Sequence, residues 1–209
     1  MTVICAVSPS GMYVPPMLIY KRKRMTDLLM KGSPAGSIGA CSANGWIDSS
    51  LFVKWLNHFV EVVKPTQEKK VLLVMDGHSS HKSLEAIELA REHGVVMISL
   101  PPHTTHRMQP LDRTFYGPLK ANYNTECDRW MTMNPGRRIS QYDQAALFGS
   151  AYIRTASMEK AVSGFRSTGL WPLNPDIFTA DDFQASLVTD EPAPSVIQQQ
   201  PLTNNVQVN

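Results

Sequence analysis

In VLLVMDGHSSH, residues 71–81, five apolar residues lead directly into an aspartate, a glycine and two histidines. The apolar run is typical of a strand that is buried on both faces of a parallel sheet. LEAIELAREH at 84–93 predicts a helix that Ser83 caps and Gly94 ends, and VVMISL at 95–100 predicts a second buried strand. A strand, a helix and a strand with short links form a βαβ unit, so we expect the two strands to run parallel.

Two aspartates follow this pair of strands. Asp76 comes directly after the first strand, and the second strand continues into LPPHTTHRMQPLD, which ends at Asp112 near the start of a helix. Reactive groups of open α/β sheets gather beyond the carboxyl ends of the strands, so both acids are expected at one edge. Two close carboxylates repel each other unless a hard divalent cation lies between them. The residues alone leave open a plainer interpretation, in which Asp76 forms a turn and Asp112 caps the helix.

Histidines surround these acids. His78 and His81 could orient a water molecule or contact a phosphate, and Gly77 would let a bulky ligand approach the backbone. The histidines lack a cysteine partner or a metalloprotease-like order, which disfavours zinc.

The segment before this unit predicts a hairpin and a helix. TVICAVSP at 2–9 and YVPPMLIYK at 13–21 are β-branched, apolar runs joined by a short turn. Pro15 and Pro16 should restrict the second run to a sheet edge or delay its start to Met17. A loop rich in small residues is expected at 32–43. It is followed by a helix between Asp48 and Lys64, which Asp48 or Ser49 can cap and which Pro65 stops.

The segment after Asp112 predicts helices and a tail. Leu119, Tyr123, Cys127 and Trp130 recur at helical spacing, and Pro118 places the helix start, or a kink, just before them. Further helices are expected at about 140–153 and 157–166. The organisation is therefore a core at 1–135, a helical extension at 136–180 and a disordered tail at 181–209, where proline, glutamine and asparagine dominate.

Composition restricts the function classes. The formal net charge is only +2, so any surface for a polyanion must be local. KRKR at 21–24 (Lys21, Arg22, Lys23 and Arg24) is the candidate, as a nucleic-acid contact, a nuclear address or merely a solvated rim. The chain has no apolar run of membrane-spanning length, so no membrane partner is expected. Its three cysteines are odd in number and far apart, which favours free thiols.

A family resemblance joins these features. The run VMDGHSSHKSLEAIELAREHGVVMISLPPHTTHRMQPLDRTFYGPLKANY resembles the catalytic core of DDE-superfamily endonucleases, in the transposases of the pogo, Tigger and Jerky type. The resemblance extends through GMYVPPMLIYKRKR and GWIDSSLFVKWLNHF upstream and GFRSTGLWPLNPDIFTADDF downstream, so it covers residues 2 to about 183.

This resemblance implies an RNase H-like α/β fold, with three antiparallel strands, a helix, and then parallel strands alternating with helices. The implied chemistry is the cutting and joining of DNA strands with Mg²⁺ or Mn²⁺ ions, one of which activates the nucleophile while the other stabilises the leaving oxygen. Asp76 matches the second acid of the family's triad and Asp112 the third, as catalytic residues and metal ligands. Lys21 to Arg24, His78 and His81 are the predicted nucleic-acid contacts.

The first acid of the family has no match, because Met1 falls at what should already be the second strand. We therefore expect a mixed sheet without its first strand, weak metal binding and a DNA endonuclease domain that is inactive by itself. Without the usual helix-turn-helix domains, DNA binding should not be sequence-specific. The alternatives are a non-catalytic scaffold for a protein partner or a homo-oligomer, and a longer gene whose upstream exon carries the missing acid. The family implies a nuclear protein.

Overall fold

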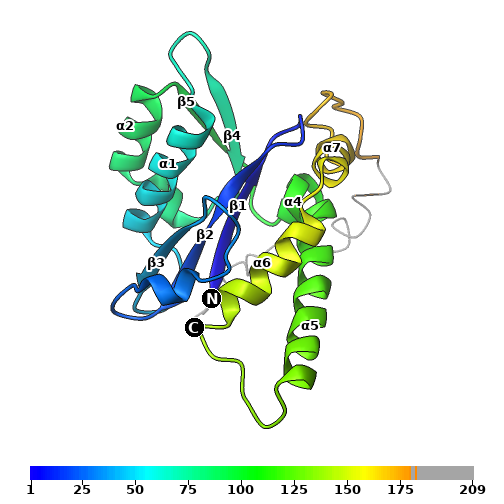
Figure 1. Ribbon diagram of the computed structural model, residues 1–209. Helices are drawn as coiled ribbons and strands as arrows, with labels where there is room; N and C mark the ends of the chain where they lie inside the picture. The colour runs from blue at the N-terminus through cyan, green and yellow to red at the C-terminus, as the bar shows by residue number, and fades with distance from the viewer. Residues whose placement is uncertain (180–181, 183–209) are drawn as a thin grey trace, which may run out of the picture. The chain divides into compact units, whose positions relative to one another are not determined.

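A computed structural model describes residues 1–179 and 182, and it divides the chain into two compact units, Met1–Asn174 and Pro175–Asn209. The first unit is an α/β domain with a mixed sheet and several helices, compatible with an RNase H-like fold (Figure 1). Its strands are β1 Thr2–Val7, β2 Tyr13–Lys21, β3 Ile38–Ser42, β4 Val71–Met75 and β5 Val95–Ser99. Its helices are α1 Ser49–Val63, α2 Leu84–Glu92, α3 Thr105–Met108, α4 Pro110–Thr114, α5 Tyr116–Met133, α6 Gln144–Thr155 and α7 Met158–Ser167, with short 3-10 turns η1 Asp27–Met30 and η2 Ser79–Lys82.

The first sheet has the order β1-β2-β3. β1 and β2 form the predicted antiparallel hairpin, whereas β3 pairs in parallel with β2, from Met17 opposite Ile38 to Lys21 opposite Ser42. The prediction of a loop over 32–43 was wrong at β3, which is a strand in addition to the predicted hairpin. The sequence IGACS has little intrinsic strand preference, so pairing with β2 rather than propensity makes it a strand.

The two prolines of β2 do not have the predicted effect. β2 begins at Tyr13 and is the central strand of its sheet, although Pro15 and Pro16 lie inside it. The prolines are tolerated because pairing with β3 starts only at Met17, and because the register with β1 shifts between Ile4 and Ala6. At these positions a missing N–H group therefore interrupts no regular ladder.

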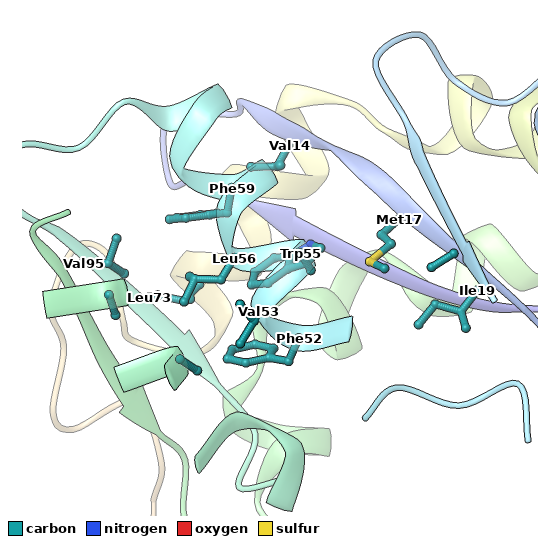
Figure 2. Packing of buried hydrophobic residues seen from close by; sticks show 13 residues of the cluster. Val14, Met17, Ile19, Phe52, Val53, Trp55, Leu56, Phe59, Leu73 and Val95 are labelled. Atoms are coloured by element: carbon teal, nitrogen blue, oxygen red, sulfur yellow. The ribbon is translucent and has the colours of Figure 1, made fainter. Parts of the chain in front are cut away.

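β2 separates two hydrophobic cores by strand alternation. Met17 and Ile19 point into one core with α1, β4 and β5, and Leu18 and Tyr20 point into the other with α4, α5 and α6. Figure 2 shows the first core, in which the side chains of α1 lie between Met17 and Ile19 of β2 and Leu73 and Val95 of the second sheet. Tyr20 donates its hydroxyl to the carbonyl of Leu29 at 2.6 Å, so this buried polar group is satisfied.

The helix α1 has the predicted ends. The Asp48 carboxylate accepts a hydrogen bond from the Leu51 amide at 2.9 Å, and the chain leaves the helix through Lys64 in the left-handed conformation. Asp48 is thus an N-cap, and hydrogen bonds from Leu51 and Ser50 hold the pKa of its carboxyl below the usual range.

The βαβ unit is confirmed. β4 and β5 pair in parallel from Val71 opposite Val95 to Met75 opposite Ser99, and α2 connects them. Ser83 caps α2 through the Ala86 amide, and Gly94 ends it at a φ of 73°. A Cβ on Gly94 would lie 2.3 Å from the Thr66 carbonyl oxygen, so only glycine fits this turn.

β4 and β5 form their own two-stranded sheet. Among the described strands, β1 pairs only with β2 and β4 pairs only with β5, which leaves one edge of each without a backbone partner. The outer face of the second sheet is aliphatic and exposed, with Leu72 56%, Val96 47% and Ile98 46% accessible. No helix in the described part of the chain is long and apolar enough to cross a membrane.

The C-terminal region of the first unit is helical, as predicted, although α6 begins at Gln144 rather than near 140. Residues 140–143 form a turn instead, in which the Asp143 carboxylate accepts hydrogen bonds from the amide and hydroxyl of Ser140. The predicted disordered tail at 181–209 lies outside the described residues apart from Asp182.

Candidate metal centre

Asp76 follows β4 directly and stands at the start of a compact turn. Its Oδ1 accepts a hydrogen bond from the His78 amide at 3.1 Å and lies 3.2 Å from Nδ1 of His81. The same Nδ1 is 3.3 Å from the Asp76 carbonyl oxygen. The Asp76 side chain nevertheless remains 45% exposed, so it can still meet a ligand from solvent.

The two histidines of this turn have different surroundings. His81 is largely buried, and its ring centroid lies 4.3 Å from that of Phe52 in α1. Burial lowers the pKa of His81, although the backbone and the charge of Asp76 oppose this. His78 is exposed, and its Nδ1 accepts hydrogen bonds from the buried Ser80.

Asp112 lies in the first turn of α4, which Pro110 begins. Pro110 and Leu111 are buried, and the Thr114 hydroxyl donates to the Lys160 carbonyl of α7 at 2.7 Å, so both ends of this short helix are anchored. The pKa of Asp112 is raised, first by burial and then by the negative charge of Asp76, while His106 opposes the shift. The structure therefore brings the two predicted acids near enough for their charges to repel.

A comparison with known proteins decides the family. The sequence model of a protein family described as DDE superfamily endonuclease matches residues 1–163 of this chain. This chain belongs to the DDE superfamily endonucleases. A relative from Cochliobolus lunatus named "MFS-type transporter clz9" is 32% identical over 199 residues, which are 93% of this chain and 21% of that protein. The chain thus spans about a fifth of that relative's length. No solved structure matches it.

The acids of this DDE endonuclease domain fit a hard divalent cation in part. Carboxylate oxygens are preferred ligands of Mg²⁺ and Mn²⁺, and a cation between Asp76 and Asp112 would relieve the repulsion that raises the pKa of Asp112. Within the described residues, no group of three or more histidine, cysteine, aspartate or glutamate side chains converges on a metal position. Asp76 and Asp112 therefore supply two carboxylates as metal ligands.

Tyr116 lies close enough to both acids for their charges to affect it, with Cys5 beside it, and the sequence did not single out either residue. Burial raises the pKa of Tyr116 well above its ordinary value, and the charges of Cys5, Asp112 and Asp76 add to the shift. Cys5 is buried on β1, and burial raises the pKa of its thiol to about 12. Tyr116 follows Asp112 by four residues, which was a usable signal, whereas nothing local to Cys5 indicates this placement.

The predicted basic contacts of the DDE domain lie on another sheet. Lys21 ends β2, and Lys23 and Arg24 are exposed just beyond it. Arg22 is held by Tyr142. The tyrosine hydroxyl accepts a hydrogen bond from Nη1 of Arg22 at 2.9 Å, and the centroid of the tyrosine ring lies 5.2 Å from Cζ of the guanidinium. Three side chains of the cluster are thus exposed for a partner, while the fourth joins β2 to the turn before α6.

Proposed function

We propose that this chain is a transposase-derived DDE endonuclease domain that binds a divalent cation and nucleic acid. The observation that supports it best is that Asp112 in α4 lies close enough to Asp76, at the end of β4, for the charge of Asp76 to add to the burial that raises the pKa of Asp112. Two acids from distant parts of the chain repel across one site, which is a cost that a bound cation would remove.

Asp76 and Asp112 would hold Mg²⁺ or Mn²⁺. When bound, the metal supplies Lewis-acid stabilisation of an oxygen of the phosphodiester, which is the chemistry of the family. The protein's own residues orient the acids: the His78 amide and His81 hold Asp76, and α4 holds Asp112. The exposed His78 ring is a candidate donor to a phosphate oxygen.

We propose that catalysis is absent or very weak in this chain alone, because the described residues bring only two acids together. Two-metal cleavage needs enough carboxylates to hold both ions about 3.5–4 Å apart. The test is incubation with supercoiled plasmid and Mn²⁺. We expect no nicking above the level of an Asp76→Ala variant, and robust nicking that this substitution abolishes would contradict the inactive state.

Nucleic-acid binding by the basic cluster is the second part of the proposal. Lys21, Lys23 and Arg24 are exposed, and contacts to phosphates should make DNA affinity fall steeply as salt rises. Replacing these three residues by alanine should abolish binding to duplexes of unrelated sequence alike. Lys69→Ala and Lys70→Ala, exposed lysines next to β4, are the matched control. Family membership and the basic run also support nuclear residence.

One observation favours a different class of function, a protein-interaction scaffold. The exposed aliphatic face of Leu72, Val96 and Ile98 would suit a protein partner or a second copy of the chain better than a phosphate backbone. DNA binding that is undetectable at low salt would favour the scaffold, since phosphate contacts are strongest there.

A further inference from the structure

His81 lies against Asp76 at two points. Its Nδ1 is 3.2 Å from the carboxylate Oδ1 and 3.3 Å from the main-chain carbonyl oxygen of the same residue. Both of these oxygens are hydrogen-bond acceptors, so the nitrogen between them must carry the proton. A neutral His81 is therefore the Nδ1–H tautomer, and it donates to the side chain and the backbone of Asp76 together.

The ring of His81 is held in this position from the other side. Its centroid lies 4.3 Å from that of Phe52, which is 2% exposed and belongs to the core shown in Figure 2. Because the His81 side chain is only 12% exposed, the imidazole cannot turn to solvent without opening this contact. His78, three residues earlier, is exposed and has the opposite arrangement, since its Nδ1 accepts from the Ser80 amide.

In the part of the chain that the structure describes, the polar contacts of the Asp76 carboxylate fall on one oxygen. Within the described part of the chain, the His78 amide and the His81 ring both reach Oδ1. Two donors on one oxygen fix the orientation of the carboxylate and leave the lone pairs of Oδ2 available.

We infer that His81 is a positioning residue, which holds Asp76 through Oδ1 so that Oδ2 is presented to a divalent cation shared with Asp112. The inference rests on the proposed cation binding. It assigns His81 to the interior of the site, whereas the sequence alone suggested a nucleic-acid contact. Donors behind a metal ligand typically change metal affinity by about 10–100-fold when they are removed.

The test uses two variants that separate the proton donor from the ring. His81→Phe keeps an aromatic ring against Phe52 but has no N–H group, and His81→Asn places an amide donor near the position of Nδ1. The Mn²⁺ affinity of the full chain is measured from the broadening of the Gly77 and His78 amide signals in NMR spectra. We expect His81→Phe to weaken Mn²⁺ binding about 10-fold or more and His81→Asn to retain most of it.

His93→Phe is the matched control. His93 is also a histidine whose Nδ1 contacts a main-chain carbonyl, that of Leu89, but it lies at the end of α2. This variant should bind Mn²⁺ as the unsubstituted chain does. Circular dichroism shows whether each variant is folded.

The ¹⁵N shifts of the His81 ring in the unsubstituted chain provide a readout that needs neither metal nor variant. The Nδ1–H tautomer at mildly alkaline pH is expected. The Nε2–H tautomer, or an unchanged Mn²⁺ affinity in His81→Phe, would overturn the role of His81. If the unsubstituted chain shows the Nδ1–H tautomer but binds no Mn²⁺, the cation proposal fails, and His81 remains a residue that orients Asp76.

Discussion

Asp112 carries an electrostatic cost that a single substitution should remove. Its pKa is raised from the usual 3.8, so the folded chain holds the proton more tightly than the unfolded chain does. Stability therefore falls as pH rises from about 3.8 through the raised pKa, and the full cost is present above the raised pKa. We expect Asp112→Asn to raise the urea midpoint at neutral pH and to lose this advantage in acid below about 3.8.

Asp143→Asn is the control of opposite sign. Hydrogen bonds from Ser140 lower the pKa of Asp143, so its carboxylate stabilises the fold above the usual pKa and stops doing so as pH falls. This substitution should lower the urea midpoint at neutral pH. A neutral-pH midpoint for Asp112→Asn at or below that of the unsubstituted chain would contradict the cost that burial and the charge of Asp76 impose on the Asp112 carboxylate.

The sequence allowed the position of a single residue to be predicted where a reactive side chain follows the end of a strand. Asp76 and Asp112 could be paired in advance because parallel strands end at one edge. The position of Cys5 could not be predicted, since it depends on how β1 packs against the helices that follow Asp112. The basic cluster was visible as a run, but the contact of Arg22 with Tyr142 joins residues 120 positions apart and leaves no local pattern.

At the level of elements, the close approach of α4 and α7 positions Asp112. A Cβ on Gly164 of α7 would lie 2.8 Å from the Pro110 carbonyl oxygen and 2.8 Å from the Thr114 hydroxyl, both in α4. We expect Gly164→Ala to push the helices apart and to reduce the free energy of unfolding by about 1–3 kcal/mol. Urea denaturation measures this loss.

Gly117→Ala in α5 is the matched control for this contact. A Cβ there meets nothing within 4 Å, so only helix propensity changes, and the fold should gain up to about 1 kcal/mol. Equal effects of the two substitutions would mean that the contact between α4 and α7 is too loose to position Asp112.

Whether an element could be predicted depends on whether the residues that stabilise it lie in the same segment of the chain. α1 and α2 could be predicted because their periodic apolar residues and their N-caps lie in the same segment of the sequence. The caps are Asp48 for α1 and Ser83 for α2. β3 has neither property, because Gly39 and Ala40 are poor strand formers whose pairing partner, β2, lies about 20 residues earlier. Long-range pairing overrode local preference at this strand and also made the proline-containing β2 a central one.

For the whole molecule, the exposed face of β4 and β5 predicts self-association. Leu72, Val96 and Ile98 are about half exposed and lie on one face, since Leu72 pairs with Val96. Replacing all three by threonine should keep the strands, because threonine is β-branched, while it removes apolar surface. We expect a shift toward monomer in sedimentation velocity, with little change in the thermal midpoint. An unsubstituted chain that is already monomeric at high concentration would contradict this.

The separation of the chain into two sheets has a kinetic consequence. β4, α2 and β5 occupy 29 consecutive residues, 71–99, so their contacts close short loops and can form early. The second core must instead bring Tyr20 together with Phe115 and Tyr152, which lie 95 and 132 positions later in the chain, at a larger loop-closure cost. During refolding, the β4–α2–β5 unit that carries Asp76 should therefore form first. The packing of α4, which carries Asp112, should follow later.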